Sequence, residues 1–334
     1  MRLLLSFVNS TIALAGYDWK EGRIFWALSS ERLKAGGICY HGSDLCVGAG
    51  DRVVRLSPTG SSSQIVISGP YDPRLHGIHP IDEFAIGVVD TGNSTVRIIN
   101  LEGHQIGLYS PVGAWLEIPD DAIHLNDFVV TPDGVLGSCF DYRPWRTIRE
   151  LISDDDWCCG GYGLVLNLSS KHNSNCNAGG CVVGCGFNHP HSLAFHAPFL
   201  YLCSSATGIF HVCRLASSGV LVPHSEVQIT KTHFLRGSCK IGNYWYLGGS
   251  TFRHERLVAE NLEIYRLDVS TGRLNTRVIE GRGEIYDILP WRDDLLEPII
   301  ARYFAGFEDH RCLAMDTSRS SDQRRRIAES VVQK

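Results

Sequence analysis

Six short apolar runs in this chain begin in the same register, and five of them begin with an ionisable residue. The runs start at residues 37, 76, 127, 191, 236 and 287, so successive starts lie 39 to 64 residues apart. Fourteen residues after each of the first five starts comes an Asp or a Ser that ends a second apolar run: Asp51, Asp90, Asp141, Ser205 and Ser250. Repeated units around an axis bring equivalent residues together at that axis. The pattern therefore predicts one pocket lined by the start residues.

Four of the start residues have side chains that bind divalent metals: His76, Asp127, His191 and Asp287. Their register predicts that they lie at one height around the axis, together with Arg236. Imidazole and carboxylate ligands together suit Zn, Mn or Fe(II), whereas Ca and Mg favour a shell of oxygen atoms. We therefore predict a divalent metal on these four residues, with Zn, Mn or Fe(II) preferred and Ca as the alternative. His79, three residues after His76, is an alternative ligand.

Three further ionisable residues, His124, His189 and Glu284, lie two or three residues before the starts, nearer the predicted mouth of the pocket. A histidine or carboxylate in such a place can move protons or orient a metal-bound imidazole. Arg236 can hold a substrate carboxylate or phosphate through paired hydrogen bonds. The predicted catalytic residues are therefore His124, His189, Arg236 and Glu284.

Long insertions follow the second apolar runs of two repeats and should border the pocket. Residues 141–161 form the longest insertion, and long loops over a pocket often serve as lids. Arg143 and Arg146 in this insertion, and Arg253 in the second one at 250–260, are predicted to bind an anionic substrate. The alternative for Arg143 and Arg146 is an exposed helix face whose charges pair with the aspartates at 154–156.

The start residues also have a structural interpretation. Asp and His at the starts of strands often bond to neighbouring backbone groups, or line the water-filled channel of a propeller. The sequence leaves the functional and the structural interpretation open.

Short runs rich in β-branched and aromatic residues alternate with turns along the chain, which predicts strands. In the first repeat the expected strands are 37–41, 45–48, 52–56 and 64–68, separated by Gly-Ser-Asp, Ala-Gly-Asp and Pro-Thr-Gly turns. One four-stranded sheet per interval predicts an all-β protein, a six-bladed β-propeller that forms a single domain over residues 1–316.

The two ends of the chain are predicted to complete one blade together. The last repeat offers one strand at residues 284–289, while the first thirty residues offer three strands and no strand of the inner type. Shared closure removes an exposed sheet edge. Residues 317–334 are expected to form a short C-terminal helix or tail.

The chain has 334 residues, a net charge of −5 and a pI near 6.3. A protein that neutralises phosphates needs a basic surface, so nucleic acid is not an expected partner. No apolar run reaches about 18 residues, so no membrane span is expected. Asn9 interrupts the apolar N-terminal run before it reaches the length of a signal peptide, which favours a cytoplasmic protein. Six of the twelve cysteines lie within apolar runs and are expected in the core: Cys39, Cys46, Cys139, Cys203, Cys213 and Cys239.

Three motifs resemble those of an uncharacterised bacterial β-propeller family: His-Pro-His-Ser-Leu at 189–193, Leu-Arg-Gly at 235–237 and Glu-Ile-Tyr-Asp-Ile-Leu-Pro at 284–290. The resemblance implies a fold and no particular activity. More loosely, the architecture is similar to the gluconolactonase and regucalcin-like six-bladed propellers, which hold one divalent metal on the axis with Glu, Asn and Asp. Streptogramin lyase-like propellers, with axial His and Glu, are another loose analogue. Histidines replace several of the comparable ligands here, so lactonase chemistry and a calcium preference do not transfer.

Taken together, these patterns predict a metal-dependent lyase, isomerase or hydrolase that acts on a small polar or anionic molecule in the axial pocket. One alternative is a non-catalytic propeller that binds a peptide, a glycan or a protein partner on the same face. A second alternative is an enzyme without a metal, in which His124 or His191 is the base and Arg236 stabilises negative charge.

Overall fold

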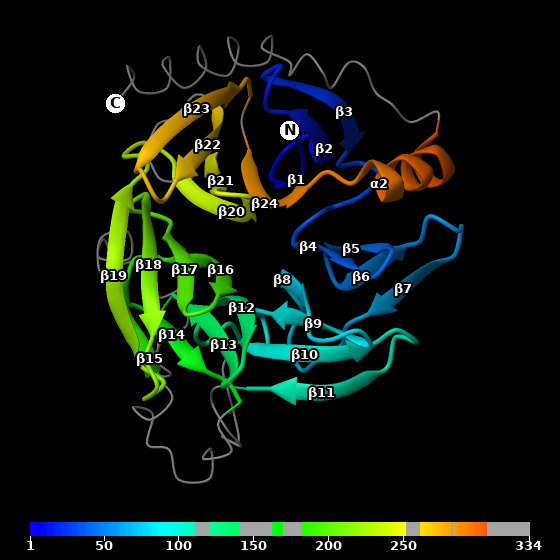
Figure 1. The fold of residues 1–334 in the computed structure, drawn as a ribbon. Coiled ribbons are helices and arrows are strands. Elements are labelled where there is room, and N and C mark those ends of the chain that lie inside the picture. The colour runs from blue at the N-terminus through cyan, green and yellow to red at the C-terminus, as the bar shows by residue number, and fades with distance from the viewer. Residues whose placement is uncertain (111–119, 141–161, 170–181, 252–260, 282, 306–334) are drawn as a thin grey trace, which may run out of the picture.

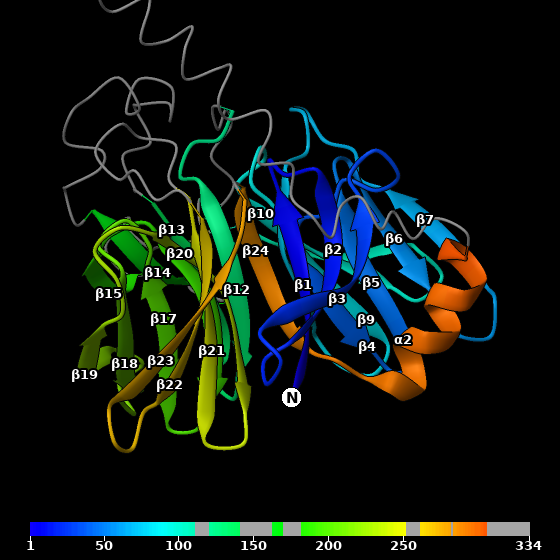
Figure 2. The same cartoon turned by 90° about the horizontal axis from the view of Figure 1, so that it is seen from above.

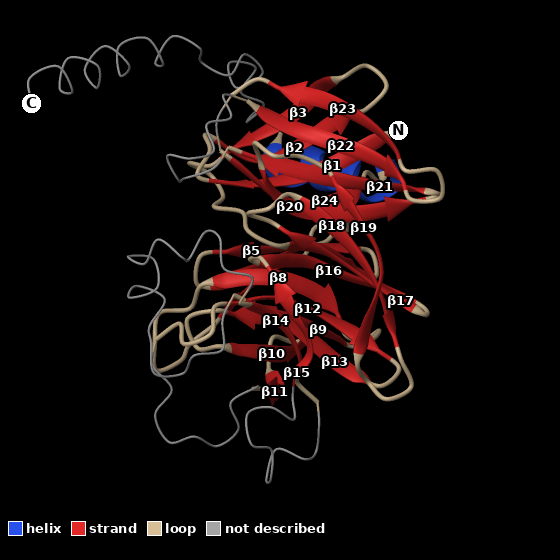
Figure 3. Cartoon of the chain, turned by 90° about the vertical axis from the view of Figure 1, so that its left-hand side faces the viewer, coloured by secondary structure: helices blue, strands red, loops and turns tan. Residues whose placement is uncertain are grey.

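The computed structural model describes residues 1–110, 120–140, 162–169, 182–251, 261–281 and 283–305. These residues form six antiparallel four-stranded sheets around a central axis (Figure 1). Figure 3 shows that strands account for most of the described chain. The prediction of an all-β, six-bladed β-propeller is confirmed. The insertion at 141–161 and the tail at 317–334 lie outside the described residues.

Each sheet is a blade whose strands follow one another from the axis outward. The first blade contains β24 (Glu284–Pro290), β1 (Arg2–Val8), β2 (Ile12–Asp18) and β3 (Arg23–Ser29). The second contains β4 (Ile38–His41), β5 (Asp44–Ala49), β6 (Arg52–Leu56) and β7 (Ser62–Val66). The third contains β8 (Leu75–Pro80), β9 (Ala85–Asp90), β10 (Thr95–Asn100) and β11 (Gln105–Tyr109).

The remaining blades repeat this plan. The fourth contains β12 (Leu125–Thr131), β13 (Gly134–Cys139), β14 (Gly163–Asn167) and β15 (Val182–Phe187). The fifth contains β16 (Pro190–His196), β17 (Phe199–Ser204), β18 (Ile209–Leu215) and β19 (Leu221–Gln228). The sixth contains β20 (Phe234–Ile241), β21 (Tyr244–Ser250), β22 (Leu262–Asp268) and β23 (Arg273–Ile279). Each blade is named below by its inner strand.

The ring is closed by strands from the two ends of the chain, as predicted. β24 pairs with β1 in antiparallel register, with Leu3 opposite Pro290 and Leu5 opposite Ile288. Figure 1 shows the two strands side by side. Each inner strand contacts the inner strands of both neighbouring blades, in the circular order β24, β4, β8, β12, β16 and β20. The inner strands therefore surround the axis completely.

The hydrophobic core lies between neighbouring blades. Between the β16 and β20 blades, Tyr201 and Phe210 pack on Trp245, whose side chain is almost fully buried. The Tyr201 and Trp245 ring centroids are 4.5 Å apart. Burial of one such side chain contributes roughly 1.5–3 kcal/mol. Since each cluster needs two blades, the blades stabilise one another. The six cysteines expected in the core are all buried.

A short helix follows the last inner strand. α2 (Asp293–Ile299) continues into a single wide turn, η4 (Ile300–Phe304), on the outside of the β24 and β4 blades (Figure 2). Leu295, Leu296 and Ile299 of α2 pack into the cluster formed by these two blades. The helix begins before the region in which the sequence predicted one. Within the described part of the chain, no helix has the length and hydrophobicity needed to cross a membrane.

Candidate functional site

Five of the six inner strands carry a β-bulge near their start, and these bulges aim the site residues. The register shifts between Leu75 and Ile78 in β8, and at equivalent places in β12, β16, β20 and β24. A bulge changes the direction of the side chains around it. His76 and His79, three residues apart on β8, therefore both contact side chains from other inner strands.

Side chains at the starts of the inner strands form a closed circuit, which we call the rim cluster. Its members are His76, His124, Phe140, His189, His191, Phe234, Arg236, Glu284 and Tyr286. The ring centroids of His76 and His124 are 5.4 Å apart, and Phe140 lies 4.4 Å from His124 and 5.2 Å from His191. Arg236 bonds to His191 and lies over the Tyr286 ring, which in turn contacts His76. The circuit joins five blades, and the β4 blade contributes glycines at this level.

His191, Arg236 and Glu284 form one hydrogen-bonded chain, and all three are more than nine-tenths buried. Arg236 donates from Nε and Nη2 to His191 Nε2, at 3.1 and 2.8 Å, and from Nη1 to Glu284 at 2.5 Å. Asn9 donates to the other Glu284 oxygen at 2.6 Å. Since arginine can only donate, His191 Nε2 accepts and Nδ1 carries the proton. Burial, followed by the charge of Arg236, holds the pKa of His191 well below its ordinary value, so the ring is neutral.

His76 and His124 differ from His191 in the partners of their ring nitrogens. In both rings Nδ1 bonds to an acceptor of the protein, and Nε2 is the acceptor nitrogen. His124 Nδ1 lies 2.9 Å from Oδ1 of Asp121, and Arg74 donates to Oδ2 of the same carboxylate at 2.8 Å. His76 Nδ1 donates to the Arg74 carbonyl at 3.2 Å. Both carboxylate and carbonyl accept, so the protons lie on Nδ1. No described residue donates a hydrogen bond to Nε2 of either ring. Burial also holds the pKa of His76 well below its ordinary value.

Backbone conformations that most residues avoid gather around the rim cluster. Six described residues other than glycine have a positive φ: Asn9, Ser94, Asp121, His124, His189 and Ser192. All but Ser94 belong to the rim cluster, bond to it or follow it directly in the chain. Asn, Asp and His tolerate this conformation better than other residues, yet it still costs energy. Strain of this kind is typical of functional sites.

Asp127, His79 and Asp287 form a second group on the inner strands, which we call the inner layer. Asp127 accepts from His79 Nε2 at 2.6 Å and from the Leu193 N–H of the next blade at 2.7 Å. Asp287 accepts from the N–H groups of Ile38, at 3.2 Å, and Ile288, at 2.8 Å. Both carboxylates thus link neighbouring blades. This agrees with the alternative in which Asp residues at strand starts bond to backbone groups.

The inner layer has its own electrostatics. Burial raises the pKa of Asp287 to about 7, with the nearby Asp127 charge adding to the rise and His79 opposing it. Burial disfavours the charged form of His79, but the Asp127 carboxylate outweighs burial and raises the pKa of His79.

The described contacts divide the start residues into two groups. His76, His191 and Arg236 belong to the rim cluster, and Asp127 and Asp287 belong to the inner layer. The four predicted metal ligands are thus shared between the two groups. Within the described residues, no three His, Cys, Asp or Glu side chains are grouped closely enough to hold a metal ion.

A glycine lets the inner layer pack closely. A Cβ atom added to Gly77 on β8 would lie 2.1 Å from an Asp127 carboxylate oxygen, far inside contact distance. Gly77 therefore makes room for the bond between Asp127 and His79.

Several members of the site were not predicted from the sequence. Asp121 and Arg74 fix the two acceptor histidines, while Phe140 and Tyr286 complete the circuit. Tyr286 lies within the Glu-Ile-Tyr-Asp-Ile-Leu-Pro motif at 284–290, and Asp121 precedes His124 by three residues. These positions are the signals that could have found them. The predicted substrate-binding residues Arg143, Arg146 and Arg253 lie outside the described residues.

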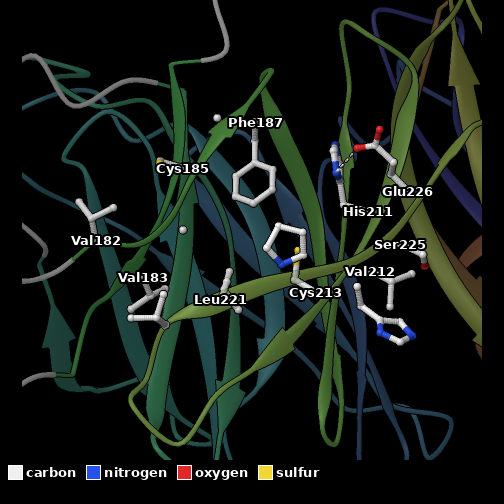
Figure 4. A pocket seen from close by; sticks show the side chains of 15 residues that line it. Val182, Val183, Cys185, Phe187, His211, Val212, Cys213, Leu221, Ser225 and Glu226 are labelled. Atoms are coloured by element: carbon white, nitrogen blue, oxygen red, sulfur yellow. Dashed lines mark ion pairs between the residues drawn. The ribbon is translucent and has the colours of Figure 1, made fainter.

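A separate hollow of about 720 Å³ lies away from the axis, between β15 and the strands β18 and β19 (Figure 4). Phe187, Cys213 and Leu221 line it with His211, whose Nδ1 is 3.7 Å from Glu226. His211 Nε2 bonds to Ser204 Oγ at 2.8 Å, but Ser204 is 2% exposed and is not among the lining residues. None of the predicted site residues borders this hollow.

Comparisons with known proteins support the fold. Neither models of known families nor curated protein sequences match this chain. Among solved structures, a protein of unknown function from Bacteroides caccae matches with a TM-score of 0.60 and 12% identity over 87% of this chain and 98% of that one. A nidogen/laminin complex matches with a TM-score of 0.55 and 12% identity over 86% and 97%. The periplasmic gluconolactonase of Pseudomonas aeruginosa matches with a TM-score of 0.50 and 14% identity over 84% of each chain.

These matches confirm the predicted resemblance, in fold, to uncharacterised and gluconolactonase-like propellers. One of the similar proteins is an enzyme and another takes part in a protein complex, so the fold is compatible with either role.

Proposed function

We propose that this propeller is an enzyme that transfers protons on a small polar molecule bound over the rim cluster, in a lyase, isomerase or hydrolase reaction. His124 is the general base in this proposal, oriented by Asp121, and Arg236 stabilises negative charge. The observation that carries the proposal is the pair formed by Asp121 and the His124 ring, which leaves Nε2 of His124 as an acceptor within the rim cluster. A carboxylate that fixes the tautomer of an imidazole in this way is typical of catalytic bases.

Two further observations support an active site here. His76, whose pKa is held well below its ordinary value by burial, places a neutral imidazole 5.4 Å from His124. His124 and Asp121 also adopt positive φ, which a purely structural pair would not need.

The proposal assigns no step to a metal. Three of the four predicted ligands use their ligating atoms in hydrogen bonds: His191 Nε2 receives Arg236, and the carboxylates of Asp127 and Asp287 receive N–H groups. The positive charge of Arg236 beside His191 also opposes a cation at that position.

The test is an unbiased search for a substrate. The purified protein is incubated with a small-molecule cell extract, and mass spectrometry follows which compounds disappear. The matched variants are His124→Asn, which suits the positive φ of this residue, and His104→Asn, which changes an exposed histidine. Removal of a general base lowers rates by about 10²–10⁴-fold.

We expect wild type and His104→Asn to consume the same compound, and His124→Asn to leave it. Consumption of the same compounds at the same rate by His124→Asn, or no consumption by the wild type, contradicts the proposal.

A further inference from the structure

The hydrogen-bond donors of the rim cluster come from other inner strands than its acceptor nitrogens. The circular order of the inner strands places β20 across the axis from β8, and β24 across from β12 (Figure 1). Arg236 on β20 and Tyr286 on β24 supply donors, whereas His76 on β8 and His124 before β12 supply acceptor nitrogens. Tyr286 contacts His76 at a ring-centroid distance of 5.6 Å, so the rim cluster offers donors and acceptors close together.

The Tyr286 hydroxyl is the most informative of these groups. It is buried, with less than 1 Å² accessible, and has no hydrogen-bond partner among the described residues. Its ring is held between His76, at 5.6 Å, and the Arg236 guanidinium, at 5.0 Å. A buried hydroxyl without a partner destabilises the folded protein, so its presence points to a group that joins it.

Arg236 adds further donors on the same side. A guanidinium has five N–H groups. Nε and one N–H on each terminal nitrogen are used by His191 and Glu284, which leaves one N–H on each terminal nitrogen. Together with Tyr286, these groups can surround an oxygen atom that carries negative charge.

We infer that the rim cluster binds a small carbonyl compound with a removable hydrogen on the neighbouring carbon, and that Tyr286 donates a hydrogen bond to the carbonyl oxygen. This inference rests on the proposed function, because it needs His124 as the base. His124 Nε2 takes the proton from carbon, and the electron pair of that C–H bond forms a C=C bond. The π pair of the carbonyl moves to oxygen, and the resulting enolate oxygen accepts from Tyr286 and Arg236. Return of the proton to carbon restores the carbonyl compound.

The experiment measures exchange of carbon-bound hydrogen in heavy water by proton NMR. The probes are pyruvate and dihydroxyacetone, each incubated with wild type, Tyr286→Phe, His124→Asn or the exposed control His104→Asn. Melting temperatures are measured for all four proteins. Tyr286→Phe removes one oxygen atom and keeps the ring between His76 and Arg236.

We expect wild type and His104→Asn to accelerate exchange of at least one probe. Loss of a single donor to an enolate oxygen lowers such rates by about 10²-fold, so Tyr286→Phe should lose exchange to that extent. Its melting temperature should be unchanged or higher, because the hydroxyl has no protein partner to lose.

The contrary results are distinct. Full exchange by Tyr286→Phe, with none by His124→Asn, overturns the role of Tyr286 and leaves the proposed function standing. A lower melting temperature of Tyr286→Phe reveals a structural hydroxyl and also overturns that role. No exchange by the wild type overturns the carbonyl class, and the extract experiment then decides separately whether the proposed function also fails.

Discussion

The rim cluster and the inner layer occupy the same inner strands, yet they use their ionisable groups differently. In the inner layer, Asp127 and Asp287 direct both carboxylate oxygens to backbone N–H groups or to His79. In the rim cluster, His76 and His124 each keep one ring nitrogen as an acceptor. Convergence on an axis therefore does not by itself make a residue reactive. The two groups differ in whether the acceptor atoms of their side chains already receive hydrogen bonds from backbone N–H groups.

The largest expected effect is on stability in the inner layer. Asp127→Ala leaves His79 and the Leu193 N–H without their acceptor. Each buried donor left unpaired costs about 1–3 kcal/mol, so the free energy of unfolding should fall by roughly 3–5 kcal/mol. Urea denaturation measures it, with the exposed Asp133→Ala as the control. A fall in the free energy of unfolding of less than about 1 kcal/mol would contradict a structural role for Asp127.

The buried ion pair of the rim cluster should give the next largest effect. Arg236→Met leaves Glu284 as a buried, poorly compensated charge, which costs about 3 kcal/mol or more. Adding Glu284→Gln removes that charge, so the double variant should be more stable than Arg236→Met alone. The measurement is a double-mutant cycle in urea. Additive losses would show that Arg236 and Glu284 are not energetically coupled.

The two layers should respond to pH in opposite directions. In the rim cluster, the folded-state pKa of His191 lies below its ordinary 6.5, so the unfolded chain binds more protons and stability falls as pH drops below about 6.5. In the inner layer, the pKa of Asp287 is raised from 3.8 to about 7, so the folded chain binds more protons and stability falls as pH rises through that window.

Variants separate these two slopes. Between pH 5 and pH 7, roughly the interval in which both groups titrate, wild type should lose stability relative to Asp287→Asn and gain stability relative to His191→Gln. Denaturation curves at both pH values provide the measurement. If the stability of wild type relative to each variant changed with pH in the same direction for both variants, the electrostatic difference between the two layers would be contradicted.

The smallest expected effect is that of metal removal. Because the predicted ligands are divided between the layers, dialysis against a chelator should leave the melting temperature unchanged. Added Zn or Mn should not raise it, since a ligand that binds only the folded state must stabilise that state. A clear fall on chelation, reversed by one of these ions, would restore the original prediction of a metal on His76, Asp127, His191 and Asp287.

The repeat register predicted the fold well because blades repeat their turns and apolar runs. The constant spacing from His76 to Asp90 and from His191 to Ser205 marks equivalent strands, and this was enough to predict six blades. Closure by β24 and β1 followed from the count of strands at the two ends.

The chemistry of the site was harder to predict because it depends on contacts between blades. Asp127 bonds to a backbone N–H 66 residues away, and Asp287 to one 249 residues away. No sequence pattern marks these donors. The bulge in β8 also lets His76 and His79, three residues apart, both contact other inner strands, which a uniform alternation of side chains would not predict.

The protonation of the axial histidines tests the central claim most directly. Nitrogen NMR of protein labelled at its histidine rings, assigned with one variant for each histidine, reports both tautomer and charge. The account predicts that at pH 7 His76 and His191 are neutral with the proton on Nδ1, while the pKa of His79 lies above that of an ordinary histidine. A proton on Nε2 of His191, or a common titration of all three rings near pH 6.5, contradicts the division into a rim cluster and an inner layer.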